Sequence, residues 1–322
     1  MALHVSNGDA TDLAGTGLAE HVVYWRDALH EGPVPAVGPE ELRRIRADFL
    51  VTAGADDRGE AARTFLERDE TLAAHRDGEY VLWFEADLYD QLQIIQVLDR
   101  LRTLEVPAER ITLICIGEHP GIAHFGGLGE LSTDKLRDLA TSNASLRLTS
   151  DALDLAARAW ATFTAPTPVG LADIAATRSV ALRFLGEAFD RLAREYPSTR
   201  DGLSLTERRI LAASRDGPTR AGTVFTRATA REVRPFLGDT WCFAIIRRLG
   251  AAPHPLLAVE PSPDKVDRHS VVRLTDVGGQ VLAAAADHVA VNGIDRWIGG
   301  VHLHGDHAEW RFDEGTETLT RH

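Results

Sequence analysis

Four short apolar runs in the first third of the chain each end in a burst of polar and charged residues. The runs span residues 3–6, 22–25, 80–84 and 111–116. Continuous apolar runs of this length are typical of strands buried on both faces, as in a parallel sheet covered by helices. The ligand crevice of such a sheet lies outside the carboxyl ends of its strands. We therefore expect the four polar bursts to meet at one edge and form a site.

Segments with helical periodicity alternate with these runs at residues 39–53, 60–76 and 88–104, and Ser132 and Thr133 are placed to cap another helix. Alternating strands and helices predict an α/β domain with a Rossmann-like parallel sheet over residues 1–148. Residues 149–203 read as purely helical, with one helix over 179–196. We interpret this stretch as a helical connector.

The last third, residues 204–322, has a different pattern. Helices are expected from 205, with Thr206 as the cap, and over 220–227, 231–249 and 277–286, with an extended segment at 271–276. Three helices, a strand and a Leu-Thr-Asp-x-Gly helix entry resemble winged-helix domains, which hold a helix-turn-helix. Residues 301–312 predict a terminal β-hairpin that turns at Gly-Asp.

Length and composition limit the number of domains and the classes of partner that we expect. A chain of 322 residues is expected to form two or three domains. Residues 200–322 hold 16 Lys and Arg against 16 Asp and Glu, so the net charge of −13 arises in residues 1–199. That acidic region is a poor nucleic-acid surface. The sequence has no apolar stretch long enough for a membrane span, no visible secretory signal and two cysteines, so we expect no membrane partner and a cytoplasmic location.

The richest burst follows the second apolar run. Arg26, Asp27, His30 and Glu31 lie within six positions of one another. The planar guanidinium of Arg26 suits a phosphate or carboxylate. The imidazole of a histidine such as His30 is ordinarily suited to proton transfer near neutral pH, and Asp27 or Glu31 would orient it or accept a proton. A solvated turn in which Arg26 pairs with Asp27 is the alternative interpretation.

The third run leads into Glu85, Asp87, Asp90 and Gln91. Asp87 suits a helix N-cap, and carboxylates favour helix N-termini electrostatically, which by itself explains Asp87 and Asp90. The same residues would also bind substrate, and Glu85 would act as a general base. Carboxylates also coordinate divalent cations, and Mg²⁺ is the cofactor that these residues suggest.

Other candidates lie on three further loops. Asn7 and Asp9 follow the first run and would contact a sugar, a phosphate or a metal, although a turn and a helix cap explain them equally well. His119 follows the fourth run, with a turn as the alternative. The glycines at 126, 127 and 129 would let a backbone approach a ligand. The sequence contains no G-x-G-x-x-G or P-loop motif and no G-x-S-x-G elbow.

The C-terminal third offers two weaker hypotheses. Arginines outnumber acids across its winged-helix-like stretch, and Arg231 and Arg234 are the residues that we would assign to DNA phosphates. His302, His304 and His307 suggest a metal site, with a surface hairpin as the favoured alternative.

The segments Trp25-Arg26-Asp27-Ala28-Leu29-His30-Glu31-Gly32-Pro33 and Trp83-Phe84-Glu85-Ala86-Asp87-Leu88-Tyr89-Asp90-Gln91-Leu92 resemble the bacterial family called domain of unknown function 1835. The resemblance covers roughly the first 130 residues, and the remainder resembles the region that accompanies this domain. It implies an α/β N-terminal fold and no particular activity. Members often carry His where this chain has Ala86, so a catalytic role of that His would pass here to His30 or His119.

Three functional hypotheses follow. The first is an enzyme, a transferase or hydrolase that acts on a small anionic metabolite, phosphorylated or nucleotide-like. In it His30 is the acid/base, Arg26 the anion clamp, and Asp9, Glu85 and Asp87 the carboxylates for substrate hydroxyls or Mg²⁺. The second is a ligand-sensing transcriptional regulator that binds DNA through its C-terminal domain. The third is a non-catalytic interaction module. The sequence leaves the oligomeric state open, a homodimer included.

Overall fold

A computed structural model describes residues 2–56, 59–123 and 125–322 of the chain. The chain divides into two compact units, residues 1–189 and 190–322, each with its own elements. Residues 149–189 of the expected connector fall in the N-terminal unit, and residues 190–203 fall in the C-terminal unit.

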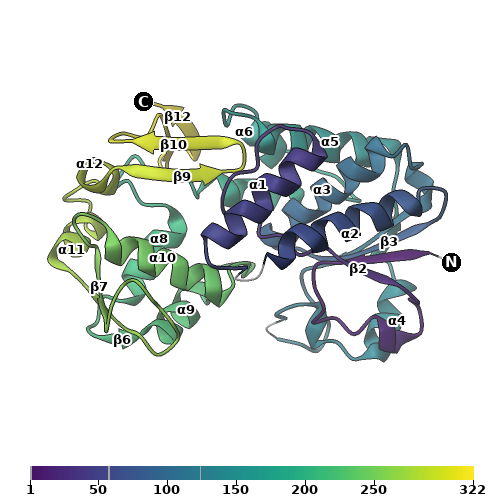
Figure 1. Cartoon of the computed structure of the whole chain (residues 1–322), viewed down its shortest axis with the longest axis horizontal. Coiled ribbons are helices and arrows are strands. Elements are labelled where there is room, and N and C mark those ends of the chain that lie inside the picture. Colours follow the sequence, from purple (N-terminus) through teal and green to yellow (C-terminus); the bar gives the residue numbers. More distant parts are fainter. Residues whose placement is uncertain (1, 57–58, 124) are drawn as a thin grey trace. The chain divides into compact units, whose positions relative to one another are not determined.

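The N-terminal unit is built on one five-stranded sheet (Figure 1). Its strands are β1 (Leu3–Ser6), β2 (Val22–Tyr24), β3 (Tyr80–Glu85), β4 (Ile111–Ile116) and β5 (Ser145–Arg147). The order is β2-β1-β3-β4-β5. Strands β1 to β4 are parallel, and β5 runs antiparallel to β4. The expectation of a mixed α/β fold with a mostly parallel sheet is confirmed, and the four apolar runs are its four parallel strands.

Helices follow the strands as the side-chain periodicity predicted. They are α1 (Pro39–Thr52), α2 (Glu60–Ala74), α3 (Leu88–Thr103), α4 (Thr133–Ala140), α5 (Ser150–Thr164), α6 (Leu171–Ala175) and α7 (Leu185–Ala193), with short 3-10 turns at Ala14–Thr16, Ala108–Arg110 and Leu128–Glu130. Side chains of Asp87, Ser132 and Thr149 cap α3, α4 and α5 by accepting backbone N–H groups that the helix leaves unpaired.

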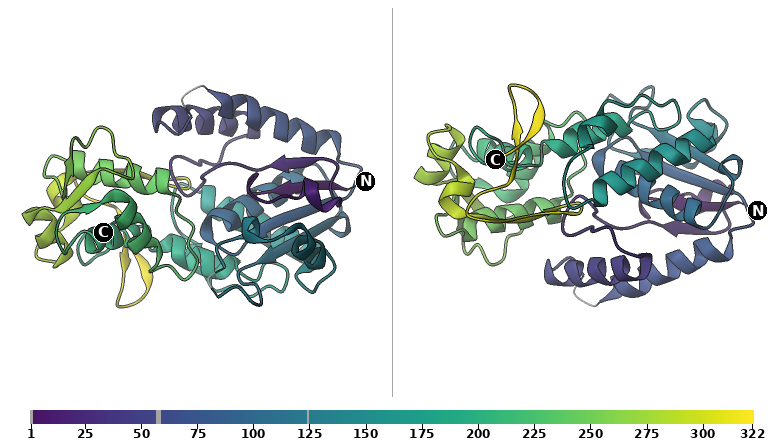
Figure 2. Two further views of the ribbon diagram at one scale, coloured as in Figure 1. Left: turned by 90° about the horizontal axis from the view of Figure 1, so that it is seen from below. Right: turned by 90° about the horizontal axis from the view of Figure 1, so that it is seen from above.

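The sheet is covered on both faces. In Figure 1, α4 lies below β2 and β3, whereas α1, α2, α3 and α5 lie above them, and Figure 2 shows α1 and α2 outside the sheet in both further views. On the α4 side, Trp83 and Ile114 from the sheet pack with Leu128 and Leu136 in one buried cluster. Strands enclosed in this way need apolar side chains on both faces, which explains their unbroken apolar sequence.

The C-terminal unit contains five helices and seven short strands among its described residues. The helices are α8 (Leu205–Ala213), α9 (Ala221–Thr229), α10 (Asp239–Ala251), α11 (Asp276–Leu282) and α12 (His288–Asn292). The strands are β6 (Thr219–Arg220), β7 (Leu257–Glu260), β8 (Val271–Leu274), β9 (Ile294–Ile298), β10 (Val301–Gly305), β11 (Trp310–Asp313) and β12 (Thr318–Arg321). Strand β8 lies between β6 and β7 in an antiparallel sheet.

Three helix predictions were wrong in detail. The expected helix 179–196 is shorter, because residues 179–184 form turns before α7. The expected helix 231–249 begins only at Asp239, since Pro235 lacks an N–H and disfavours helix in the residue before it. Ser204, and not Thr206, caps α8, in a capping box with Glu207.

The predicted terminal hairpin was also wrong. Strand β10 pairs with the preceding β9 across Gly299 and Gly300, and β11 pairs with β12. Gly299 has a φ of +59°, a conformation that tight hairpin turns require and that glycine adopts without strain. The sequence prediction overlooked β9 and therefore joined the wrong pair.

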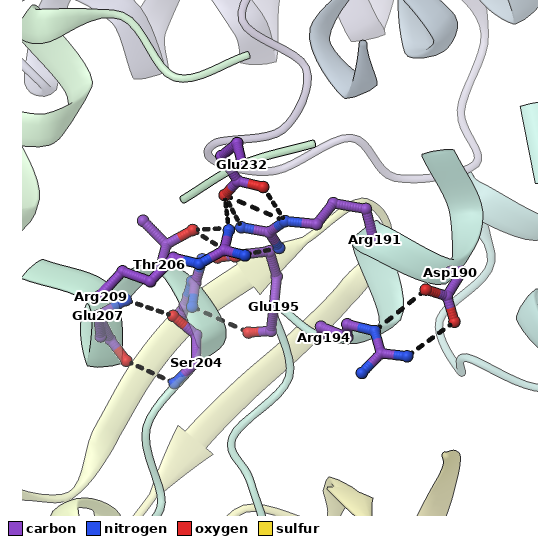
Figure 3. A network of polar contacts seen from close by, with 10 residues as sticks. Asp190, Arg191, Arg194, Glu195, Ser204, Thr206, Glu207, Arg209 and Glu232 are labelled. Carbon is purple, nitrogen blue, oxygen red and sulfur yellow. Dashed lines mark hydrogen bonds and ion pairs between the residues drawn. The ribbon is translucent and has the colours of Figure 1, made fainter. Parts of the chain in front are cut away.

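A buried ion network stabilises the C-terminal unit (Figure 3). Arg191 contacts Glu195 and Glu232, each at 2.7 Å, and Thr206 donates a hydrogen bond to Glu195 at 2.5 Å. Arg296 contacts the other Glu195 oxygen at 2.5 Å. Although burial by itself raises the pKa of Glu195, Arg191 and Arg296 hold it at about 2.

None of the helices within the described residues combines the length and apolar character that crossing a lipid bilayer requires.

Candidate functional site

The carboxyl ends of β1 and β3 meet where the strand order changes direction. From β1 the chain continues to β2 on one side, and from β3 it continues to β4 on the other. Open α/β sheets bind ligands in the crevice at such a switch point. Asn7 directly follows β1, and Glu85 ends β3, so both residues lie at this position.

A glycine loop holds the side chain of Glu85. Its Oε1 accepts a hydrogen bond from the backbone N–H of Leu128 at 2.8 Å. A Cβ atom added at Gly127 would lie 2.6 Å from Oε2, and Gly127 has φ +147° and ψ 174°, a region nearly restricted to glycine. The loop over residues 126–129, expected to approach a ligand, therefore lies against the Glu85 carboxylate.

Asp87 and Asp90 occupy the first turn of α3. Asp87 is the N-cap and accepts a hydrogen bond from the Asp90 backbone at 3.1 Å. Asp90 is fully buried. Both of its carboxylate oxygens accept a hydrogen bond from Nδ2 of Asn7 at 2.9 Å, and Oδ2 also accepts one from the backbone N–H of Glu85 at 2.5 Å. Asp90 thus ties the ends of β1, β3 and α3 together.

Two buried side chains, Gln91 of α3 and Cys115 of β4, hold the backbone of Glu85. Gln91 donates a hydrogen bond to the Glu85 carbonyl at 2.8 Å, and Cys115 lies 3.4 Å from the same oxygen. Burial raises the pKa of the Cys115 thiol, so it stays protonated at neutral pH. Gln91 supports the site rather than facing it.

The three carboxylates are crowded and poorly solvated. Burial raises the pKa of Glu85. Burial, followed by the charge of Glu85, raises the pKa of Asp87 to about 7. Burial and the charges of Asp87 and Glu85 raise the pKa of Asp90 well above its usual value. Acids pushed this far toward neutral pH are suited either to hold a proton or to hold a cation that replaces it.

These residues fit a divalent cation. Within residues 2–56, 59–123 and 125–322, Glu85, Asp87 and Asp90 are the set whose ligand oxygens all lie within 4.8 Å of one another. Both oxygens of Asp90 already accept hydrogen bonds, so Glu85 and Asp87 are the residues available to hold the ion. Mg²⁺ is commonly held by one or two carboxylates together with water and substrate phosphates.

His30 lies near the start of α3, where its ring contacts Tyr89. Its side chain is buried, and its ring meets the ring of Tyr89 edge-on, with centroids 5.8 Å apart. Tyr89 stands between Asp87 and Asp90 in the first turn of α3. Burial raises the pKa of Tyr89, so it stays a neutral phenol.

Asp27 and Glu31 were expected to assist His30 in catalysis, but both contact Arg46 of helix α1. The Asp27 carboxylate is buried and pairs with Arg46 of α1 at 2.7 Å, while the carbonyl of the buried Glu31 accepts a hydrogen bond from Arg46, also at 2.7 Å. This network attaches the loop after β2 to α1. The structure thus gives Asp27 a structural partner in place of Arg26.

The remaining candidates of the N-terminal unit, Asp9, Arg26 and His119, have their contacts outside the carboxylate cluster. Arg26 forms an ion pair with Asp9 at 2.9 Å, with 48% and 70% of their side chains exposed. Asp9 therefore lies outside the carboxylate cluster, with Arg26 as its contact. His119 is half-buried, and its ring nitrogen contacts the carbonyl of Pro120 at 2.8 Å. Within the described chain, no contact joins His119 to the cluster.

The C-terminal candidates are dispersed. Arg231 is exposed and Arg234 is half-buried, both between α9 and α10. His302 contacts Asp295 at 2.7 Å and stacks on Trp297. His307 lies in an exposed loop beyond β10, and the described residues form no metal-ligating group around it.

The structure thus brings together Asn7 at the end of β1, Glu85 at the end of β3, and Asp87, Asp90 and Gln91 at the start of α3. Sequence reasoning missed two supports. The backbone N–H of Leu128 could not be recognised from the sequence, because every residue except proline has this donor. Tyr89 could have been recognised, since an aromatic residue between two acids at the start of a helix faces the same region as they do.

A scan of the sequence against protein-family models matches no family, and a search of curated proteins finds no significant match.

Proposed function

We propose that the N-terminal unit is a Rossmann-like enzyme domain that acts on a small phosphorylated or nucleotide-like metabolite with the assistance of Mg²⁺. The observation that carries this proposal is the trio of Glu85, Asp87 and Asp90 at the β1/β3 switch point, where burial raises the pKa of all three carboxyl groups and that of Asp87 to about 7. Uncompensated crowding of three acids is costly, so it indicates a function that uses them.

The residues would divide the work as follows. Glu85 and Asp87 would hold the cation, because their outer oxygens are the ones available. Asn7 and Asp90 position them through hydrogen bonds. His30 would move a proton, and Arg26, exposed at the same edge, would bind the anionic group of the substrate. When bound, Mg²⁺ would neutralise phosphate charge.

Mg²⁺ binding tests the proposal directly. Titrating the full chain with Mg²⁺ at pH 8 should raise its unfolding midpoint, because an ion that binds only the folded state stabilises it. Asp87→Asn should abolish the rise. Asp134→Asn is the matched control, since Asp134 is an exposed acid in the first turn of α4 and should leave the rise intact.

The reaction is tested with a panel of nucleotides and sugar phosphates followed by ³¹P NMR. We expect turnover that depends on Mg²⁺, and we expect His30→Gln to reduce it by about 10²-fold or more while Mg²⁺ binding persists. A chain that neither binds Mg²⁺ nor changes stability with any compound of the panel would contradict the proposal.

A second function is favoured by one observation in the C-terminal unit. The order α8, β6, α9, α10, β7, β8, with β8 between its two partners, is the order of a winged-helix domain. We propose as the alternative a ligand-sensing regulator whose C-terminal unit binds DNA, with Arg231 and Arg234 on phosphates. Asp239 and a half-buried Trp241 begin α10, which weakens the match to a recognition helix.

This alternative predicts DNA binding that falls steeply with salt. Gel-shift measurements on a genomic fragment library at low salt should then show complexes that are lost in an Arg231→Gln/Arg234→Gln double variant. Absence of any complex would remove the alternative. Both cysteines are buried and free, which agrees with a cytoplasmic protein under either proposal.

A further inference from the structure

Three arginines from three helices share a single carboxylate in the N-terminal unit. Asp69 of α2 contacts Arg43 of α1 at 2.9 Å, its neighbour Arg68 at 3.3 Å, and Arg100 of α3. The side chains of Asp69 and Arg68 are 8% and 5% exposed. Three guanidinium groups against one buried carboxylate leave positive charge that the cluster itself does not neutralise.

Arg68 is the least satisfied member. Its guanidinium lies over the rings of Trp25 and Phe65, at 3.9 Å and 4.3 Å from their centroids. Among the residues that the structure describes, its buried Nη1 has no hydrogen-bond partner. Burial lowers the pKa of this guanidinium, and the charges of Asp69 and Asp27 oppose that effect only in part. A buried donor of this kind normally has a partner.

A small cavity adjoins these arginines. Its volume is about 160 Å³. Its lining includes Gln96 of α3, Trp160 of α5 and four arginines, Arg43, Arg46, Arg68 and Arg100. The volume is about five times that of a water molecule in the liquid, enough for a phosphate ion and too small for a nucleotide. The acids on its wall are Asp69 and Asp99, against four arginines.

We infer that this cavity is a binding site for a phosphate group, held by Arg43, Arg68 and Arg100. Guanidinium groups match the geometry of phosphate oxygens and form strong charge-assisted hydrogen bonds with them. A bound phosphate would join α1, α2 and α3 through these arginines.

The cavity is separate from the carboxylate site. Asp90 and Arg100 are ten residues apart on α3, which corresponds to about 15 Å along the helix. One site is acidic and suits a cation, whereas the other is basic and suits an anion. The inference therefore does not depend on the proposed function.

The test is calorimetric titration of the full chain with inorganic phosphate at constant ionic strength and without Mg²⁺. We expect saturable binding that Arg43→Gln and Arg100→Gln each weaken at least about tenfold. Arg44→Gln is the matched control, because Arg44 is next to Arg43 on α1 but is exposed and pairs with Asp48. It should leave the dissociation constant unchanged, as should Asp87→Asn.

A further variant distinguishes weaker phosphate binding from loss of folding. Asp69→Asn removes the carboxylate that competes for the arginines, so it should tighten phosphate binding, an effect that partial unfolding does not produce. A parallel titration with glycerol phosphate separates the two sources of the group: similar affinity indicates a phosphorylated metabolite, and much weaker affinity indicates the free ion. No saturable binding of either compound, or equal loss in Arg44→Gln, would overturn the inference.

Discussion

At the scale of single residues, Asp87 combines two requirements that oppose each other. As the N-cap of α3 it accepts a backbone N–H, which favours a charged carboxylate. Its burial and the neighbouring Glu85 favour the protonated form, and these effects prevail, because its pKa rises to about 7. The charge of Asp87 therefore destabilises the free protein at pH 8.

Replacing Asp87 with asparagine tests this balance. Asn caps helices as well as Asp does. A pKa raised above the usual 3.8 means that the acid contributes stability at low pH and that this contribution is lost as the pH rises through about 7. Asp87→Asn should therefore raise the free energy of unfolding at pH 8 by about 2–3 kcal/mol more than it does at pH 5. Urea unfolding without Mg²⁺ at both pH values measures this. Equal destabilisation at both would contradict it.

Gly127 positions Glu85 through its own backbone conformation. Its φ and ψ lie in a region that side chains avoid, and a Cβ would meet the Glu85 carboxylate. Gly127→Ala should cost about 1–3 kcal/mol of stability and weaken Mg²⁺ binding. Gly8→Ala is the control, since it lies in the loop after β1 with open space around it. Urea denaturation and Mg²⁺ titration of both variants test this prediction. Equal losses of stability and of Mg²⁺ affinity in Gly127→Ala and Gly8→Ala would contradict it.

How well the sequence predicts the position of a residue depends on how far along the chain its partners lie. Glu85, Asp87 and Asp90 come from the polar burst after one strand, and their ligand oxygens lie within 4.8 Å of one another. Asp27 was expected to serve His30 or, in the alternative interpretation, to pair with the adjacent Arg26, but its partner is Arg46, nineteen positions further along the chain. That pair forms only when α1 folds back on the loop, and one sequence carries no sign of it.

At the scale of elements, the Arg46–Asp27 pair fixes α1 to the loop after β2. Arg46 also donates hydrogen bonds to the carbonyls of Ala28 and Glu31. Arg46→Met would leave a buried aspartate uncompensated and should cost about 3–5 kcal/mol. Arg44→Met, which removes an exposed pair on the same helix, should cost no more than about 0.5 kcal/mol. Thermal or urea unfolding compares them, and similar losses would show that the pair is dispensable.

Element boundaries were predictable where local signals were strong. Strands β1 and β4 and helix α3 were predicted within a residue, because unbroken apolar runs and an N-cap aspartate mark them. The start of α10 was not, since the apolar periodicity continues through Pro235 while the backbone does not. Pairing of β9 with β10 was missed because several turns near the C-terminus are compatible with a hairpin.

At the scale of the whole molecule, alternation of strands and helices was sufficient to predict the α/β class. The order β2-β1-β3-β4-β5 was not predictable, because an alternating sequence is compatible with several strand orders. That order decides where the site forms, since it places the ends of β1 and β3 side by side. The sequence therefore predicted that the polar bursts meet, but not which pair of strands lies at the switch point.

The two units should respond to pH in opposite directions. In the N-terminal unit, the raised pKa values of Glu85, Asp87 and Asp90 mean that acidification from pH 8 to pH 5 adds stability. In the C-terminal unit, Glu195 has a pKa held at about 2, so its contribution is complete above the usual 4.5 and is lost only as the pH falls toward 2.

Hydrogen exchange followed by mass spectrometry separates these responses, because it reports protection for residues 1–189 and 190–322 individually. From pH 8 to pH 5, after correction for intrinsic exchange rates, protection should rise around β3 and α3 and stay constant around α8. From pH 4.5 to pH 3 it should fall around α8. Glu195→Gln should lower protection in the C-terminal unit at every pH and remove its acid sensitivity, because Arg191 and Arg296 would lose their shared partner. Parallel changes in both units would instead mean that one cooperative transition, and not two local charge clusters, governs the stability of the chain.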